Sequence, residues 1–305
     1  MAAKAKNRDY AIRAPRADAV FHAVVLLFLA LVTIVILFPV LNIIATSFSS
    51  YNAVIAGRVW IWPAEFQLET YKAVFSSGSI FLGYRNTILY TVLGTCVNLA
   101  VTICAAYPLS FSDLRGKNAL SGFFAFTMLF SGGMVPGYIV VNRLGLIDTI
   151  WAMLLPGALS VWNMIIMRTY FSTQIPRELK EASQLDGCGE LRYLWQIVLP
   201  LSVPILMVVG LYYAVGIWNS YFDAMIYMTT RSKMPLSVFL RDILILNDSS
   251  DMTAAMDPDA LVSLQERQNV MKYALIMVSS VPMFLLYPFV QRYFIKGVMI
   301  GSVKG

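Results

Sequence analysis

The sequence is poor in charged residues and in the side chains that hydrolytic enzymes use. Only 13% of its 305 residues are charged and 58% are hydrophobic, whereas a soluble domain carries about 25% charged residues. There is one histidine, His22, and the three cysteines have no spacing typical of a metal site or a disulfide framework. The chain also lacks the glycine-rich phosphate loop of ATPases. These absences argue against hydrolytic and metal chemistry, and the composition indicates a polytopic membrane protein.

Six long windows of the sequence contain no Asp, Glu, Lys or Arg. They are 19–57, 86–112, 118–142, 149–167, 193–222 and 273–291. A helix needs about 20 apolar residues to cross a membrane, and a charge at the bilayer centre costs about 2.5–3.5 kcal/mol. The first apolar core, 21–46, is too long for a signal peptide. We therefore predict an all-α fold with six transmembrane helices.

The Lys and Arg residues are divided unevenly between the two sides that six crossings create. The side that carries both termini and the loops near 113–117 and 168–192 holds 14 of the 23, so the positive-inside rule makes it cytoplasmic. The predicted parts are a cytoplasmic tail (1–20), the first transmembrane helix (21–46), an extracytoplasmic segment (47–84), a core (85–292) with a cytoplasmic loop (171–195) and an extracytoplasmic loop (223–272), and a cytoplasmic tail (293–305). The loop at 223–272 is either a solvated connector or a docking surface for an external partner.

The most polar long interruption in the second half of the chain is the stretch 175–204. Pro176 suits the first turn of a helix, and Gly187 lies where a left-handed C-terminal cap is expected. Three apolar residues share one face of this helix: Leu179, Ala182 and Leu185. Because the helix is too short to be stable alone, we expect it to rest against protein. With Pro200 and Pro204 interrupting the following apolar run, the stretch predicts a helix–break–helix elbow; composition alone also allows an ordinary interfacial loop.

The same stretch resembles the cytoplasmic EAA loop of ATP-binding-cassette (ABC) importer permeases. The matching residues are Glu181-Ala182-Ser183, Asp186-Gly187 and Ile197-x-Leu199-Pro200. Ser183 and Cys188 stand where alanine is usual in that family, but both are small. The resemblance implies the transmembrane domain of a type I ABC importer. It also implies that the residues coupling it to an ATPase are Glu181, Ala182, Ser183, Asp186, Gly187, Leu199 and Pro200.

Other segments are similar to the carbohydrate-uptake branch of this family, so the resemblance covers nearly the whole chain. They are Arg85-Asn86-Thr87, Trp218-Asn219, the stretch 286–297 and the terminus 300–305. The sequence Ser131-Gly132-Gly133-Met134-Val135-Pro136 is similar to a subgroup linked to complex and acidic saccharides. The narrowest resemblance is to the second membrane subunit of an alginate-oligosaccharide importer.

The resemblance implies a set of partners in the bacterial inner membrane. They are a second homologous permease, an ATPase dimer that binds ATP and magnesium, an extracytoplasmic solute-binding protein, an oligosaccharide substrate and membrane lipid. No cofactor, metal or nucleic acid is expected on this chain. The family also implies that Lys304 and Gly305 lie near the ATPase.

Saccharide sites combine aromatic faces with hydrogen-bonding side chains, and five residues within the predicted spans offer these groups: Asn98, Asn163, Tyr213, Trp218 and Asn219. The alternative for each is an interhelical hydrogen bond or a packing contact. No Lys or Arg lies within a predicted span, so groups that bind an acidic sugar must come from helix ends, the partner permease or the binding protein.

Three other functions remain as alternatives. An ABC permease for another solute, such as an amino acid, would share the elbow. A self-sufficient secondary transporter usually carries buried acids or histidines for ion coupling, and the predicted spans contain no Asp or Glu. An intramembrane enzyme would need catalytic groups that the sequence lacks.

Overall fold

The computed structural model describes residues 16–76, 78–111, 113–246, 270–289 and 291. Every regular element in these ranges is helical. The chain divides into two compact units, residues 1–68 and residues 69–305, which we describe separately. The predicted contacts of Lys304 and Gly305, the tail at 1–15 and the loop residues 247–269 lie outside the described residues.

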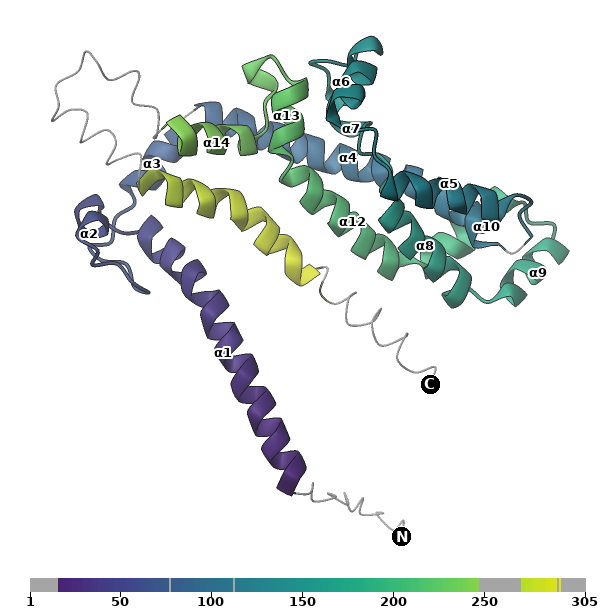
Figure 1. Cartoon of the computed structure of the whole chain (residues 1–305), viewed down its shortest axis with the longest axis horizontal. Helices are drawn as coiled ribbons and strands as arrows, with labels where there is room; N and C mark the ends of the chain where they lie inside the picture. Colours follow the sequence, from purple (N-terminus) through teal and green to yellow (C-terminus); the bar gives the residue numbers. More distant parts are fainter. Residues whose placement is uncertain (1–15, 77, 112, 247–269, 290, 292–305) are drawn as a thin grey trace, which may run out of the picture. The chain divides into compact units, whose positions relative to one another are not determined.

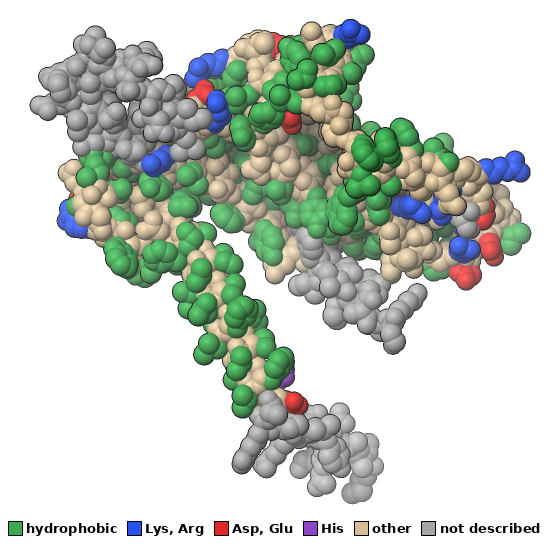
Figure 2. Space-filling model, viewed as in Figure 1, with side chains coloured by type: hydrophobic (Ala, Val, Ile, Leu, Met, Phe, Trp, Pro, Cys, Tyr) green, Lys and Arg blue, Asp and Glu red, His purple; other side chains and the backbone are tan. Residues whose placement is uncertain are grey.

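The first unit is built on α1 (Arg16–Ser47), which contains the whole apolar core predicted at 21–46. The most apolar 18-residue window of its span Val20–Ser47 has a mean hydropathy of 3.2, and none of that window is buried within the chain. Figure 2 shows hydrophobic side chains along its whole visible face. This is the pattern of a helix surrounded by lipid.

The segment after α1 folds back through polar contacts around α2 (Tyr51–Ile55). The Asn42 side chain donates to the Trp60 carbonyl at 2.7 Å, and the Ser50 hydroxyl donates to the Glu65 carboxylate. Arg58 pairs with that carboxylate at 3.1 Å. These contacts close a small loop structure beyond the end of the helix.

The second unit is organised around the 33-residue helix α4 (Gly78–Ser110), shown in blue in Figure 1. It packs against several other helices. Those with which it makes the most extensive contact are α8 (Val161–Gln174), α12 (Val203–Trp218) and α14 (Leu236–Leu246). At Gly83 a methyl group would lie 3.0 Å from the Leu236 Cα, so glycine permits the close approach of α4 and α14.

The predicted crossing at 118–142 is a bent pair of helices. α5 (Lys117–Leu129) and α6 (Met134–Arg143) meet at 113°. Gly133, between them, has φ +85°, a conformation that glycine adopts without strain. The absence of charge marked this window as compatible with lipid, but it carried no information about the break.

The predicted crossing at 149–167 is also divided. α7 (Ile150–Leu154) is followed by an irregular segment containing Pro156 and Gly157, and α8 then continues beyond Arg168. Among the described residues, three helices are long and apolar enough to cross a membrane, or up to five if each bent pair counts as one span. The fold is therefore all-α with several candidate spans, and the number six stays a prediction.

Short elements complete the second unit. They are α3 (Glu69–Ser76), α9 (Arg177–Leu185), α10 (Glu190–Tyr193), a π-helical turn η1 (Leu194–Val198), α11 (Leu199–Leu201), α13 (Tyr221–Tyr227) and a 3₁₀ turn η2 (Arg231–Lys233). The unit also contains the long helix Val270–Phe289. One apolar core surrounds the Ser110 end of α4 with residues of α8 and α10–α12. A second core joins the Gly78 end to α3, α14 and the helix Val270–Phe289.

Candidate functional site

The stretch 175–204 forms the predicted elbow at the Ser110 end of α4 (Figure 1). α9 ends at Leu185, and Gly187 has φ +73°. The Gly187 N–H donates to the Gln184 carbonyl at 3.0 Å, and the Cys188 N–H donates to the Ser183 carbonyl at 2.8 Å. These two bonds define a Schellman cap, so the left-handed cap predicted at Gly187 is confirmed.

Most of the elbow residues that match the EAA pattern face outward. Glu181, Ala182, Asp186 and Gly187 are exposed, and Figure 2 shows charged side chains gathered at this end of the unit. Ser183 is the exception, because it is only 6% exposed and its hydroxyl donates to the Lys180 carbonyl at 2.7 Å. Ser183 is thus turned toward the chain itself.

The apolar face of α9 is left uncovered by the part of the chain that the structure describes. Leu185 is 90% exposed and Leu179 is 39% exposed. The expectation that this face rests against protein therefore stays a prediction. Two neighbouring apolar residues, Leu191 and Trp195, are also 75% and 70% exposed. The elbow presents apolar side chains mixed with Glu181 and other charged groups, a composition suited to a protein contact.

The root of the elbow is a distorted helix. The Leu199 N–H bonds to the Leu194 carbonyl in the π-helical turn, and Pro200 has no N–H with which to continue the ladder. The chain then bends by 83° before α12. Leu199 is half-buried against the core and Pro200 is exposed. The predicted interruption by Pro200 and Pro204 is therefore present, and the chain bends between Leu201 and Val203.

Side chains tie the elbow to α4, and sequence reasoning did not identify these contacts. The Tyr107 hydroxyl donates to Glu190 Oε2 at 2.8 Å, and Lys180 Nζ lies 3.1 Å from Glu190 Oε1. The same Lys180 Nζ lies 3.4 Å from the centre of the Phe111 ring. A cavity of about 260 Å³ adjoins these residues. The only sequence signal is the pair of opposite charges flanking the glycine break.

Three of the five predicted substrate residues line one cavity of about 310 Å³ between α4, α8 and α12: Asn98, Asn163 and Tyr213. Tyr212 and Asp223 also line it, and its lining contains no Lys or Arg. The structure therefore brings these three predicted residues together in a polar, partly aromatic pocket.

The polar groups in this cavity are used differently. The Tyr213 hydroxyl lies 2.7 Å from Thr102 Oγ1 and accepts the Ser160 N–H at 3.0 Å, so it joins three helices. Asn98 donates weakly to the Gly157 carbonyl at 3.4 Å. Asn98 is only 3% exposed, and its Oδ1 atom has no hydrogen-bond partner among the described residues. Such a buried acceptor is costly unless another group satisfies it.

The other two predicted substrate residues line a separate cavity of about 260 Å³ beside the helix Val270–Phe289. The Trp218 indole N–H donates to the Ser279 carbonyl at 3.1 Å, and its ring meets the Tyr84 ring edge-on. Asn219 is exposed and donates to the Val215 carbonyl at 2.8 Å. Both side chains already make contacts within the chain, and they do not join the other three.

A second polar cluster, which the sequence did not reveal, lies near the Gly78 end of α4. Asp148 accepts the Thr229 and Thr230 N–H groups at 3.1 and 2.9 Å, and the Thr230 hydroxyl at 2.7 Å. Lys233 Nζ lies 2.6 Å from its Oδ2 atom. The Lys233 ammonium, with the Thr230 and Thr229 donors, holds the pKa of Asp148 well below its usual range.

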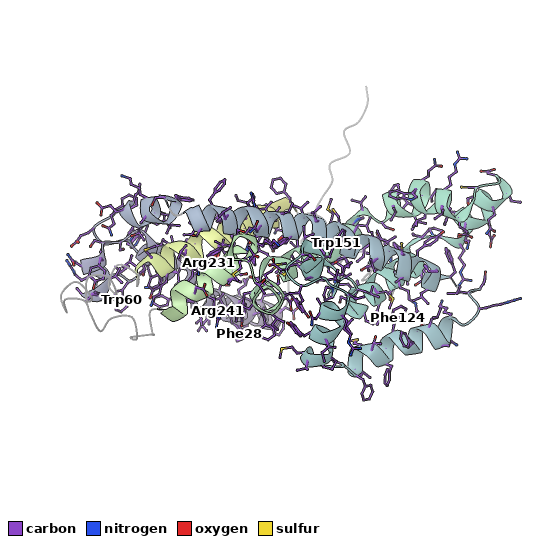
Figure 3. All side chains as sticks on the ribbon, turned by 90° about the horizontal axis from the view of Figure 1, so that it is seen from above. Phe28, Trp60, Phe124, Trp151, Arg231 and Arg241 are labelled. Atoms are coloured by element: carbon purple, nitrogen blue, oxygen red, sulfur yellow. The ribbon has the colours of Figure 1, made fainter. Side chains whose placement is uncertain are left out.

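The Asp148 cluster is continuous with α4. Tyr90 donates to the Lys233 carbonyl at 2.7 Å, and Asn86 donates to the Ser232 carbonyl at 2.7 Å. Arg231 and Arg241, labelled in Figure 3, belong to η2 and α14 in the same region, and each lies 3.8 Å from a carboxylate oxygen of Asp242. Within the described residues, no group of three or more His, Cys, Asp or Glu is arranged to hold a metal ion.

Comparison with known proteins identifies the family. No protein-family model matches the sequence. LplC of Bacillus subtilis (strain 168) is 42% identical over 290 residues, which cover 95% of this chain and 97% of LplC. The polygalacturonan/rhamnogalacturonan transport system permease protein YtcP of the same bacterium is 39% identical over 278 residues, covering 91% and 96%.

A solved structure gives the same result. A chain in the crystal structure of a bacterial ABC transporter involved in the import of the acidic polysaccharide alginate matches with a TM-score of 0.81 and 32% identity. The match covers 92% of this chain and 98% of that chain. The chain belongs to the family of ABC transporter permeases for sugars, which are multi-pass subunits of inner-membrane transporters and not enzymes.

Proposed function

We propose that the chain is one of two homologous permease subunits in a type I ABC importer for oligosaccharides, with six crossings and both termini in the cytoplasm. The observation that carries this proposal is the exposed elbow at 175–204, in a chain that matches sugar permeases over almost its full length. The charge asymmetry of the sequence supports the orientation. The two bent pairs and the α7–α8 segment supply the crossings beyond the three long helices.

The elbow is the proposed contact with a separate ATPase dimer, which binds the ATP and magnesium. Exposed Glu181, Ala182, Asp186 and Gly187 would meet the ATPase, together with the apolar side chain of Leu185. Leu199 and Pro200 connect this contact to α12 at the 83° bend. Closure of the ATPase would then move α12 with the elbow, because the capped helix and its root form a short, stiff link. Lys304 and Gly305 are proposed as a further ATPase contact.

The cavity between α4, α8 and α12 is the proposed wall of the substrate path. Asn98 and Asn163 offer amide groups to sugar hydroxyls, and the unpartnered Asn98 Oδ1 supports this role. Tyr213 keeps a structural position in the same wall, because its hydroxyl is already bonded to two other helices. Trp218 and Asn219 are weaker candidates, since they line another cavity.

The proposed cargo is an acidic oligosaccharide. Two of the similar proteins carry polygalacturonan/rhamnogalacturonan and alginate in their names. Because the cavity lining contains no Lys or Arg, this chain would contact hydroxyl groups of such a sugar. The partner permease, helix ends or a soluble binding protein would neutralise its carboxylates. The binding protein is proposed to dock on the outer segment 223–272, which begins with α13, η2 and α14.

The test uses the complete complex reconstituted in vesicles with its ATPase and binding protein. ATPase activity is measured with alginate oligomers, galacturonate oligomers, neutral maltodextrins and amino acids. Strongest stimulation by the two acidic saccharides is expected. Stimulation by maltodextrins alone would show that the cargo is a neutral saccharide and not an acidic one. Stimulation by amino acids alone would show that the permease carries a solute other than a sugar.

A further inference from the structure

The elbow touches α4 through a small group of side chains whose geometry is specific. Glu190, at the start of α10, receives Lys180 on one carboxylate oxygen at 3.1 Å and the Tyr107 hydroxyl on the other at 2.8 Å. Lys180 also sits over the Phe111 ring, and the Tyr107 and Phe111 rings meet edge-on at 4.9 Å. We call these four residues the brace.

The brace joins three segments that are separate in the sequence. Tyr107 lies in the last turn of α4 and Phe111 just beyond it, Lys180 lies in α9, and Glu190 lies in α10 on the other side of the Gly187 cap. One carboxylate therefore connects both arms of the elbow to the end of the longest helix. The cap at Gly187 fixes only the junction of α9 and α10, and the apolar core packs α10 and η1 against the end of α4. The brace adds the polar contacts that tie α9 and α10 together to α4.

Three of the four brace residues, Tyr107, Phe111 and Lys180, line a cavity of about 260 Å³. The Glu190 side chain is 56% exposed and the Lys180 side chain is 22% exposed. An ion pair of this exposure contributes little to stability by itself. Its position, rather than its strength, gives it a role in setting the angle of the elbow.

We propose that Tyr107, Lys180 and Glu190 are positioning residues that hold the elbow at a fixed angle to α4. This inference rests on the proposed role of the elbow as the ATPase contact. When the ATPase moves the elbow, the brace moves α4 with it, while the root at Leu199 and Pro200 moves α12. Both helices line the substrate cavity, so the two links together change its walls.

The test measures the distance between the elbow and α4 in the reconstituted full complex. Spin labels are placed on the native, exposed Cys104 of α4 and on Gln184→Cys near the end of α9, with Cys96 and Cys188 changed to serine. Pulsed electron paramagnetic resonance spectroscopy then gives the distribution of distances between the two labels. Tyr107→Phe keeps the ring and removes the hydroxyl, and Glu190→Gln keeps the shape and removes the charge.

Each of these two variants is expected to raise the population of displaced elbows by about three- to tenfold, because a hydrogen bond to a charged group is lost at a partly exposed site. The matched control is Arg192→Ala, which removes a hydrogen bond between Arg192 and Gln196 that does not reach α4. Its distance distribution should equal that of the unaltered complex. The exchanged pair Lys180→Glu with Glu190→Lys should narrow the distribution again.

Distributions that stay as narrow as in the unaltered complex in both Tyr107→Phe and Glu190→Gln would overturn the brace. The contact between elbow and ATPase is tested separately by crosslinking Leu185→Cys to the ATPase. A crosslink together with an unchanged width of the distance distribution would contradict the proposed role of the brace but not the proposed function. Widening without a crosslink would support the brace as a positioning device and contradict the ATPase contact.

Discussion

The two ends of α4 are held by polar clusters of different construction. Near the Gly78 end, Asp148 binds two backbone N–H groups, a hydroxyl and Lys233, so it fixes the course of the loop itself. At the Ser110 end, Tyr107, Lys180 and Glu190 are joined through their side chains. Bonds to backbone groups fix the course of a loop, whereas side-chain bonds between separate helices hold those helices to one another when one of them moves.

The different construction of the two clusters indicates which part of the unit is expected to move. The Asp148 cluster anchors α13, η2 and α14 at the start of the outer segment, and it should behave as a fixed frame. The elbow is a capped unit attached by side chains and by a bent root, and it should move as a body. Substitutions in the Asp148 cluster should therefore lower stability, and substitutions in the elbow should weaken the coupling of ATP hydrolysis to uptake.

The largest effect is expected from Gly187→Pro. Proline fixes φ near −65° and removes the N–H that now bonds Gln184, whereas Gly187 has φ +73°. We expect uptake per ATP hydrolysed to fall about tenfold or more, because the two arms of the elbow lose their fixed relation. Membrane insertion should persist. Gly189→Ala is the control, since a methyl group there meets nothing within 4 Å, and its coupling should be normal.

Asp148→Asn is expected to have a large effect on stability and none on coupling. Asparagine tolerates the φ of +58° but loses the charge that faces Lys233. The melting temperature should fall by several degrees, while uptake per ATP in the folded fraction stays unchanged. Uncoupling with a normal melting temperature would contradict the view of this end as a fixed frame.

The pH dependence of the Asp148 cluster has a defined sign. Its pKa is lowered in the folded protein, so its contribution is fully present above the unfolded value of about 3.9 and is lost as the pH falls toward the folded value. The difference in melting temperature between the native chain and Asp148→Asn should therefore be constant between pH 5 and 7. A difference that already shrinks over that range would count against the cluster.

Smaller effects are expected in the cavity between α4, α8 and α12, where Tyr213 has a structural role and Asn98 a proposed role in substrate contact. Tyr213→Phe leaves the Ser160 N–H without its acceptor, which should cost about 1–3 kcal/mol of stability. Asn98→Ala removes a side chain with one weak bond, so it should change the saccharide concentration for half-maximal ATPase stimulation with little change in melting temperature. Equal effects of both variants on melting temperature would remove the distinction.

The smallest effect is expected from Ser183→Ala. Its hydroxyl bonds only to a carbonyl in the same helical turn, and the side chain faces the chain rather than solvent. Melting temperature and uptake per ATP should both stay near their native values. A strong loss of coupling would show that Ser183 contacts the ATPase directly.

The sequence predicted the features that depend on local chemistry. Gly187 signalled a left-handed cap, Pro200 signalled an interrupted helix, and the apolar core at 21–46 signalled α1; each is present. These features depend on the φ preference of glycine, the missing N–H of proline and the length of an apolar run. All three can be read from neighbouring residues.

The features that the sequence did not predict depend largely on contacts between residues far apart in the chain. Tyr107 and Glu190 are 83 positions apart, and Asp148 and Lys233 are 85 positions apart, so no local pattern could join them. The breaks at Gly133 and Pro156 divided two charge-free windows, because compatibility with lipid does not require a continuous helix. An apolar stripe also does not reveal whether its partner belongs to the same chain, so the exposure of Leu185 could not be predicted.

The most direct measurement for the central claim is the site-specific crosslink of the elbow in the assembled complex. Leu185→Cys is introduced with Cys96, Cys104 and Cys188 changed to serine, and single cysteines are placed around the permease-facing surface of the ATPase. A crosslink between Leu185→Cys and the ATPase is expected. A thiol reagent unable to cross the membrane should label the cysteine only from the cytoplasmic side. Labelling from the outer side, or crosslinks solely to the binding protein, would contradict the proposed ATPase contact.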